Sequence, residues 1–180
     1  MHRKNQLVVG IVLAIALIIV QGLAQDVSAN RKADEEDIYA LVLRSQMEEW
    51  IRGGDKSEAE AKDASDKAIA KRLNFIVFFV SINGGDPSDA FMKRFDDLPR
   101  TIRKASSEVP DKGPHTPVDK STGKTGIVFE AEKLQWRSND MVKVEGGYYC
   151  GGLCAAGITF TVKRENGRWV IKGSRMNWIS

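Results

Sequence analysis

The residues best suited to chemistry lie around position 150. Tyr148 and Tyr149 precede Cys150, and Cys154 follows after a Gly-Gly-Leu spacer. If the protein is exported, two cysteines at this spacing favour a disulfide, which a turn between them would bring within bonding distance. Reduced or metal-bound cysteines and a redox-active pair remain as alternatives. The redox alternative is the weaker interpretation because the spacing is not Cys-x-x-Cys and no helix N-terminus is predicted nearby to lower a thiol pKa.

The same region contains a candidate ligand-binding wall. Glycines at 146, 147, 151, 152 and 157 interrupt a strand-rich stretch, and glycine within strands marks bulges, bends or close backbone approach. The simplest prediction is a strongly bent sheet. A more specific hypothesis is a pocket lined by Trp136, Tyr148 and Tyr149, whose rings have polar tips suited to such walls. Neighbouring strand residues face opposite sides, so only one of the two tyrosines could line a concave interior.

Two acids on predicted strands are candidates for a general base. Glu130 and Glu145 would have to point into a pocket to act in a hydrolase or isomerase. A carboxylate on a strand that faces water contributes no such chemistry, and that is the commoner situation. We therefore assign no catalytic residue.

Other familiar motifs fail on residue identity. His115 is the one histidine after residue 24 and lies in a Gly- and Pro-containing loop, which does not supply the three protein ligands of a catalytic zinc site. Thr122-Gly123-Lys124-Thr125 resembles the end of a phosphate-binding loop, but Val118 stands where the first glycine is required. The sequence therefore predicts no metal and no cofactor.

The amino terminus has the pattern of a cleavable signal peptide. Arg3 and Lys4 precede an apolar run from Leu7 to Val20, and Gly22 and Ala24 fit a cleavage site after residue 24. We therefore expect a periplasmic or secreted protein. The alternative is an uncleaved anchor in the inner membrane formed by residues 7–24, although spanning a bilayer takes about 20 apolar residues. Residues 25–34 are predicted to be a linker, and residues 35–180 a single domain.

Charge bears on the class of partner. The leader holds two of the 27 basic residues and none of the 24 acidic ones, so the remaining chain is close to neutral. A near-neutral domain has no basic footprint for nucleic acid. We expect instead a small molecule or an envelope protein as partner, with the membrane involved only through an uncleaved leader. The sequence does not indicate an oligomeric state.

The first half of the domain is predicted to be mainly helical. A helix is expected over about 35–52, with Leu43 off its apolar stripe; the stripe consists of Ile38, Leu41, Val42, Met47, Trp50 and Ile51. A capping box at Ser57 predicts a second, peripheral helix. Between the helical segments, residues 75–80 predict a strand buried on both faces. Asp86 and Pro87 then predict the cap and first residue of another helix.

Further along, one or two helical turns are expected over 102–106 and a loop over 107–124. Strands are then predicted at 127–131, 134–137, 141–149, 158–164 and 168–172. Asn166-Gly167 favours a two-residue type I′ hairpin that pairs Arg164 with Trp169 and Val162 with Ile171. The chain therefore belongs to the α+β class, with N-terminal helices packed on a curved antiparallel sheet whose C-terminal part is a meander.

The carboxyl half resembles uncharacterised exported bacterial proteins. The resemblance runs from Val118-Asp119-Lys120 through Gly146-Gly147-Tyr148 and Gly167-Arg168-Trp169 to Trp178-Ile179-Ser180. The order of elements also resembles the nuclear-transport-factor-2-like, cystatin-like fold, which includes SnoaL-like enzymes and non-catalytic binding modules. That resemblance implies a cone in which a bent sheet cradles helices. It places no catalytic acid on a numbered residue of this chain.

Three functions are therefore hypotheses. The first is an exported, non-catalytic module that binds a small molecule or another protein. The second is a small hydrolase or isomerase with an acidic base in a cone-shaped pocket. The third is thiol-disulfide redox work by Cys150 and Cys154.

Overall fold

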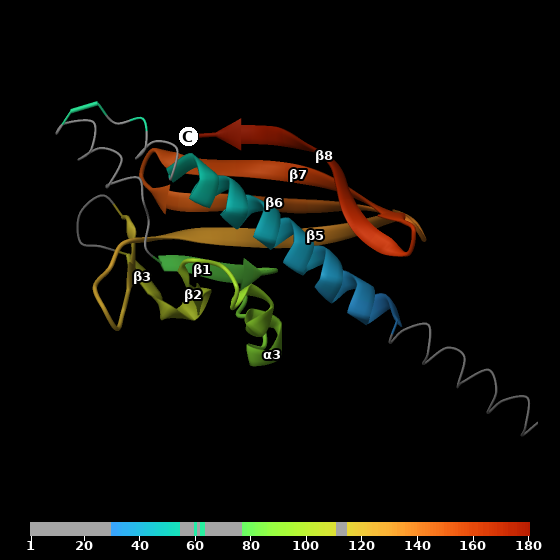
Figure 1. Cartoon of the computed structure of the whole chain (residues 1–180), viewed down its shortest axis with the longest axis horizontal. Helices are drawn as coiled ribbons and strands as arrows, with labels where there is room; N and C mark the ends of the chain where they lie inside the picture. Colours follow the sequence, from blue (N-terminus) through green and yellow to red (C-terminus); the bar gives the residue numbers. More distant parts are fainter. Residues whose placement is uncertain (1–29, 55–59, 61, 64–76, 111–114) are drawn as a thin grey trace, which may run out of the picture. The chain divides into compact units, whose positions relative to one another are not determined.

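The computed structural model describes residues 30–54, 60, 62–63, 77–110 and 115–180 (Figure 1). The chain divides into two compact units, residues 1–36 and residues 37–180, and the second contains the whole sheet. The predicted leader and the start of the predicted linker lie outside the described residues. So does most of the second predicted helix, of which residues 60, 62 and 63 are described.

Residues 30–54 form one continuous helix, longer at both ends than the predicted 35–52. Residues 30–34, which we expected in a linker, are helical as well. Leu43, predicted to lie off the apolar stripe, is fully buried, whereas Leu41 is half-buried. The buried face is therefore wider than a strict stripe, as a helix lying across a broad sheet requires.

A six-stranded mixed sheet carries residues 37–54 of this helix on one face (Figure 1). The strand order is β2-β1-β5-β6-β7-β8. The strands are β1 (Val77–Ile82), β2 (Thr101–Lys104), β5 (Gly126–Ser138), β6 (Met141–Gly151), β7 (Cys154–Glu165) and β8 (Arg168–Ile179). One N-terminal helix on a largely antiparallel sheet is consistent with the predicted α+β class.

The core lies between the helix and the sheet. It joins one face of the helix to alternate residues of β1, β5, β6 and β7. Its fully buried members include Ile38, Val42, Leu43, Met47, Val80, Ile127, Phe129, Val142, Val144 and Val162. Each such side chain contributes roughly 1.5–3 kcal/mol through removal of its apolar surface from water.

The strand β1 is buried on both faces, as its apolar sequence predicted, because residues 77–81 are all buried. The prediction of a purely antiparallel sheet was wrong at this strand. β1 pairs in parallel with both β2 and β5, so Phe78 lies opposite Ile102 on one side and Ile127 on the other. Parallel neighbours on both sides account for its continuous apolar sequence.

The segment after β1 differs from its prediction in two places. The helix is short, comprising α3 (Asp89–Met92) and the 3-10 turn η1 (Lys93–Phe95), and its N-cap is Ser88, whose hydroxyl accepts from the Phe91 N–H at 3.1 Å. Asp86 instead accepts from the Ser106 N–H at 2.9 Å. The helical turns expected over 102–106 are β2 and a 3-10 turn, η2 (Ala105–Ser107).

The expected loop over 107–124 contains a small antiparallel pair. β3 (Glu108–Pro110) pairs with β4 (Pro117–Asp119), and Val109 lies opposite Val118. A tight turn after β4 leads into β5, because Asp119 accepts hydrogen bonds from the hydroxyls of Ser121 and Thr122.

The C-terminal meander β5–β8 confirms the predicted hairpin. Arg164 pairs with Trp169 and Val162 with Ile171, and Asn166 and Gly167 both have positive φ, 51° and 78°. These values are those of a type I′ turn. β8 continues well beyond the predicted residue 172, to Ile179, and forms an edge of the sheet.

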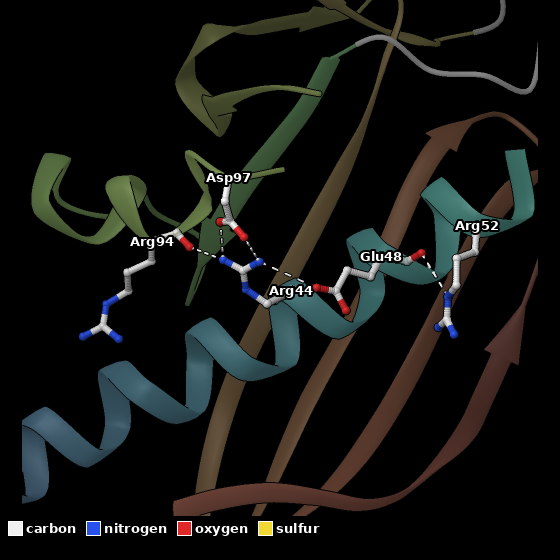
Figure 2. Close-up of polar contacts among 5 residues, drawn as sticks. All are labelled: Arg44, Glu48, Arg52, Arg94 and Asp97. Atoms are coloured by element: carbon white, nitrogen blue, oxygen red, sulfur yellow. Dashed lines mark hydrogen bonds and ion pairs between the residues drawn. The ribbon is translucent and has the colours of Figure 1, made fainter. Parts of the chain in front are cut away.

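A polar cluster ties the helix to the α3–η1 segment (Figure 2). Both terminal nitrogens of Arg44 bind Asp97, at 2.8 and 2.7 Å, and one of them also donates to the carbonyl of Arg94. Glu48, one turn along the helix, lies 3.6 Å from Arg44 Nη1. Asp37 pairs with Arg94 at 2.7 Å, so two ion pairs hold this segment to the helix.

Candidate functional site

An open apolar pocket of about 370 Å³ lies between the helix and the sheet. The last turns of the 30–54 helix form one wall, and the facing side chains of β6, β7 and β8 form the other. Its lining residues are Gln46, Glu49, Trp50, Gly53, Gly54, Tyr148, Ile158 and Met176. Pockets that hold small ligands have this character: mostly apolar walls with a few placed polar groups, and volumes of roughly 300–1,000 Å³.

Two aromatic rings meet at the pocket. Trp50 of the helix packs edge-to-face on Tyr148 of β6, with ring centroids 5.1 Å apart and an interplanar angle of 78°. Such pairs contribute about 0.5–1.5 kcal/mol beyond their buried area. Tyr148 lies opposite Phe129 of β5, whose side chain is fully buried in the core. The tyrosine therefore stands where the core ends and the pocket begins.

Gln46 is the polar residue buried at this site. It lies on the sheet-facing side of the helix and is only 4% exposed. Its Nε2 donates to the backbone carbonyl of Glu130 on β5 at 3.2 Å. Its Oε1 is buried and has no hydrogen-bond partner among the described residues. An unpaired buried amide oxygen costs about 1–3 kcal/mol, so its retention needs an explanation.

Gly146 makes room for the Gln46 amide. A Cβ at this position would lie 2.9 Å from the Glu130 carbonyl oxygen and 3.1 Å from Gln46 Nε2. Any other residue would therefore push on both partners of that hydrogen bond. Here the glycine permits close approach between a side chain and the sheet, the role that glycine has within strands.

A second cleft, of about 440 Å³, lies on the face of the sheet opposite to the helix. It contains Glu130, Glu132 and Glu145, together with Tyr149 and Trp178. Glu132 and Glu145 lie opposite each other in the β5–β6 register. Both acids proposed as general bases, Glu130 and Glu145, thus lie among the residues of this cleft rather than the apolar pocket.

The electrostatics of the two acids differ. Burial raises the pKa of Glu130 above its ordinary value, and the neighbouring Glu132 raises it further. Glu145 instead forms an ion pair with Lys133 at 2.8 Å, and the hydrogen bond that the Lys133 ammonium donates to Glu145 raises the pKa of Lys133. Glu145 is therefore held by a cation, whereas Glu130 gives up its proton less readily than a carboxyl group in water.

The three aromatic residues predicted to line one pocket do not share the apolar pocket, which Tyr148 alone of them lines, whereas Tyr148 and Tyr149 both border the second cleft. Tyr148 lies at the apolar pocket. Tyr149 is on the opposite side of β6, and its hydroxyl donates to the His115 carbonyl at 2.8 Å. Trp136 packs edge-to-face on Trp169, with centroids 5.7 Å apart, and lines neither of the two pockets. Alternation along the strand explains the separation of the two tyrosines.

Cys150 and Cys154 form a disulfide, as the sequence predicted. Their Cα atoms are 5.2 Å apart, and the bond closes the short turn between β6 and β7, where Gly151 pairs with Cys154. Cys150 is buried, with 4% exposed. Burial of one sulfur at a tight turn suits a structural bridge.

The turn at Gly123 and Lys124 is arranged around a side chain of the protein itself. The Gly123 N–H donates to the Asp119 carbonyl at 2.8 Å, and the Thr122 hydroxyl donates to the Asp119 carboxylate at 2.7 Å. The residues that resembled a phosphate loop therefore form a closed turn around an acid.

The described part of the chain contains no group of three or more histidine, cysteine, aspartate or glutamate side chains placed to hold a metal ion. None of the described helices is both long and apolar enough to cross a membrane.

Comparison with known proteins gave no match: no family model, curated protein or solved structure is similar to this chain. The resemblance to nuclear-transport-factor-2-like proteins therefore stays a prediction.

Sequence reasoning missed Gln46 and the specific role of Gly146. A signal for the first was present, because Gln46 lies four residues after Val42 and four before Trp50, both of which were on the predicted stripe. A polar residue at that spacing is one that the helix turns toward the core. For Gly146 no local signal distinguishes it from Gly147; its partner lies on a helix one hundred residues earlier in the chain.

Proposed function

We propose that the domain is a non-catalytic binding module that holds a small, largely apolar molecule between the helix and the sheet. The observation that carries this proposal is the apolar pocket of about 370 Å³ walled by Trp50, Tyr148, Ile158 and Met176. Apolar area of this kind provides affinity through the hydrophobic effect, while the few polar groups orient the ligand.

The enzymatic alternative has less support. General acid-base catalysis needs an acid or base within reach of the bound substrate. Glu130 and Glu145 line the cleft on the other face of the sheet, and Glu145 is engaged by Lys133. Glu49, the acid at the apolar pocket, is exposed on the helix surface.

The redox alternative predicts an accessible thiol pair. Burial of Cys150 and the position of the bridge at a turn favour a structural role instead. Mass spectrometry of protein taken from its native compartment separates the two: a structural bridge stays oxidised, whereas a redox pair is found partly reduced.

Export and fold family remain parts of the proposal. The pattern of residues 1–24 and the Cys150–Cys154 bridge together support an extracytoplasmic location. We further propose that the sheet curves around the helix as in nuclear-transport-factor-2-like modules, which would place the pocket inside a cone. N-terminal sequencing of the mature protein should begin after Ala24; a protein that begins at Met1 would instead be anchored.

The binding proposal is tested by fluorine NMR titration of the purified protein with fluorobenzofuran, a flat apolar probe. Saturable broadening of the probe signal is expected. Met176→Glu should abolish it because the substitution places a charge on an exposed wall residue, 54% exposed in the wild type, with little demand on folding. Trp178→Ala, on the opposite face, is the control and should bind like the wild type. No saturation by the wild type, or equal binding by Met176→Glu, would refute the proposal.

A further inference from the structure

We propose that the apolar pocket selects flat, apolar ligands that carry one hydrogen-bond donor, and that Gln46 Oε1 accepts from this donor. The inference rests on the proposed binding function and adds the chemistry that makes the binding selective. It depends on how the Gln46 amide is oriented, what surrounds it and what the pocket walls require.

The amide orientation follows from the sheet. Gln46 Nε2 is the atom that faces the Glu130 carbonyl, at 3.2 Å. The reverse orientation would bring two acceptors together, because an amide oxygen and a carbonyl oxygen both lack a proton. Oε1 therefore lies on the side of the amide away from that carbonyl. Gly146 lies next to the amide and has no Cβ, so the Gln46 side chain keeps this position without a clash.

Oε1 is an acceptor in need of a donor. The Gln46 side chain is nine-tenths buried or more, and none of the described residues donates to Oε1. Most buried polar atoms of folded proteins have at least one partner. Gln46 is part of the pocket wall but Oε1 itself is buried, so a molecule in the pocket brings the missing donor once the amide turns slightly toward the pocket.

The remaining walls define the rest of the ligand. Trp50 and Tyr148 present an edge-to-face aromatic pair, and Ile158 and Met176 add aliphatic surface. Aromatic edges and faces pack well on a planar ring. Glu49 lies at the same pocket, which disfavours an anion. The ligand class is therefore a neutral, planar, aromatic molecule with one N–H or O–H group.

The test compares two probes of the same shape, fluoroindole and fluorobenzofuran, with fluorine at the same ring position. They differ in one group: indole has an N–H donor where benzofuran has an ether oxygen. Fluorine NMR titration of the wild-type protein should give a dissociation constant for fluoroindole that is about 3- to 10-fold lower, the ratio expected for one net hydrogen bond. This comparison requires no variant and hence no assumption about folding.

Gln46→Met then tests whether Gln46 Oε1 is the atom that accepts the hydrogen bond from the ligand. Methionine has a similar length and no strong acceptor, so the preference for fluoroindole should fall to about 1-fold while fluorobenzofuran affinity is retained. Glu132→Gln changes an acid on the opposite face of the sheet and should keep the wild-type preference.

The outcomes separate this inference from the binding function itself. Equal affinity of the wild type for both probes overturns the donor inference and leaves the pocket a binding site. If Gln46→Met weakens the binding of both probes equally, the donor inference is also overturned, because Gln46 would then only shape the pocket. Saturable binding of neither probe overturns the binding function and the inference together.

Discussion

Arg44 and Asp97 form a two-pronged ion pair in which Nη1 and Nη2 of the arginine each bind one carboxylate oxygen, at 2.8 and 2.7 Å (Figure 2). The two residues are 53 positions apart in the chain, so the pair joins the helix to the segment that follows α3 and η1. A planar guanidinium matches a carboxylate in this geometry, which lysine cannot reproduce.

The first prediction concerns acid. The hydrogen bond from Arg44 lowers the pKa of Asp97 below its ordinary value of 3.8, so the folded state favours the ionised form. Its stabilising contribution is complete above the unfolded pKa and is lost as the pH falls through the folded pKa. Asp97→Asn should therefore be less stable than the wild type at neutral pH, and the difference should shrink between about pH 5 and about pH 2.

Urea unfolding at a series of pH values measures this difference. Asp96→Asn removes the same charge one residue away and serves as the control for net charge. A constant difference between wild type and Asp97→Asn across the acid range would show that the ion pair does not contribute to stability.

The second prediction concerns the Asn166-Gly167 turn. Gly167 has φ of 78° with nothing within 4 Å of an added Cβ, so Gly167→Ala changes backbone strain and not packing. Left-handed backbone costs an L-residue roughly 1–2 kcal/mol, and the free energy of unfolding should fall by that amount. Gly173→Ala is the matched control, because Gly173 also has open space and no positive φ. Equal effects of the two substitutions in urea unfolding would contradict the type I′ assignment.

This turn shows why some features were predictable from sequence. Asn166 and Gly167 specify the turn locally, and the alternation on either side fixes the register without knowledge of the rest of the fold. The burial of β1 on both faces could likewise be predicted from its continuous apolar sequence. Both are properties of neighbours in the chain.

The features that were missed depend on distant partners. The sequence of residues 77–82 does not indicate that β2 and β5 both run parallel to β1. Ser88 rather than Asp86 caps α3 because Asp86 is engaged by the Ser106 N–H, twenty residues away. Gln46 and Gly146 form one arrangement across the helix–sheet interface, and neither residue predicts the other. Burial at such an interface is decided by packing that periodicity alone does not encode.

The third prediction concerns Glu130. Burial first, and Glu132 second, raise its pKa above the ordinary 4.5, so the fold favours its protonated form. This contribution is present below the unfolded pKa and is lost as the pH rises through the folded pKa. Glu130→Gln mimics the protonated state, so it should be more stable than the wild type at neutral pH, with the gain vanishing in acid. Thermal unfolding at several pH values measures the gain, and a gain that is largest in acid would reverse the sign argued here.

The fourth prediction compares two glycines of the sheet. Gly146→Ala would press a methyl group against the Glu130 carbonyl, 2.9 Å away, and against Gln46 Nε2 and Phe160 Cε2 at 3.1 and 3.2 Å. The backbone oxygen is held in the sheet, so the strain cannot be relieved cheaply, and overpacking of this kind costs roughly 1–3 kcal/mol. A methyl group at Gly157 would meet the ring of Trp178, which is 55% exposed and can turn aside. Gly157→Ala should therefore cost less than Gly146→Ala in urea unfolding, while its tryptophan fluorescence shifts because Trp178 moves.

The same pair of variants tests the link between Gly146 and Gln46. If the glycine makes room for the amide, Gly146→Ala should displace Gln46 and reduce the preference for fluoroindole over fluorobenzofuran, because Oε1 then no longer lies where a ligand's donor can reach it. Gly157→Ala alters a residue that lines the cleft on the other face and should keep that preference. Loss of the preference in Gly157→Ala, with its retention in Gly146→Ala, would place the donor's partner on the opposite face of the sheet.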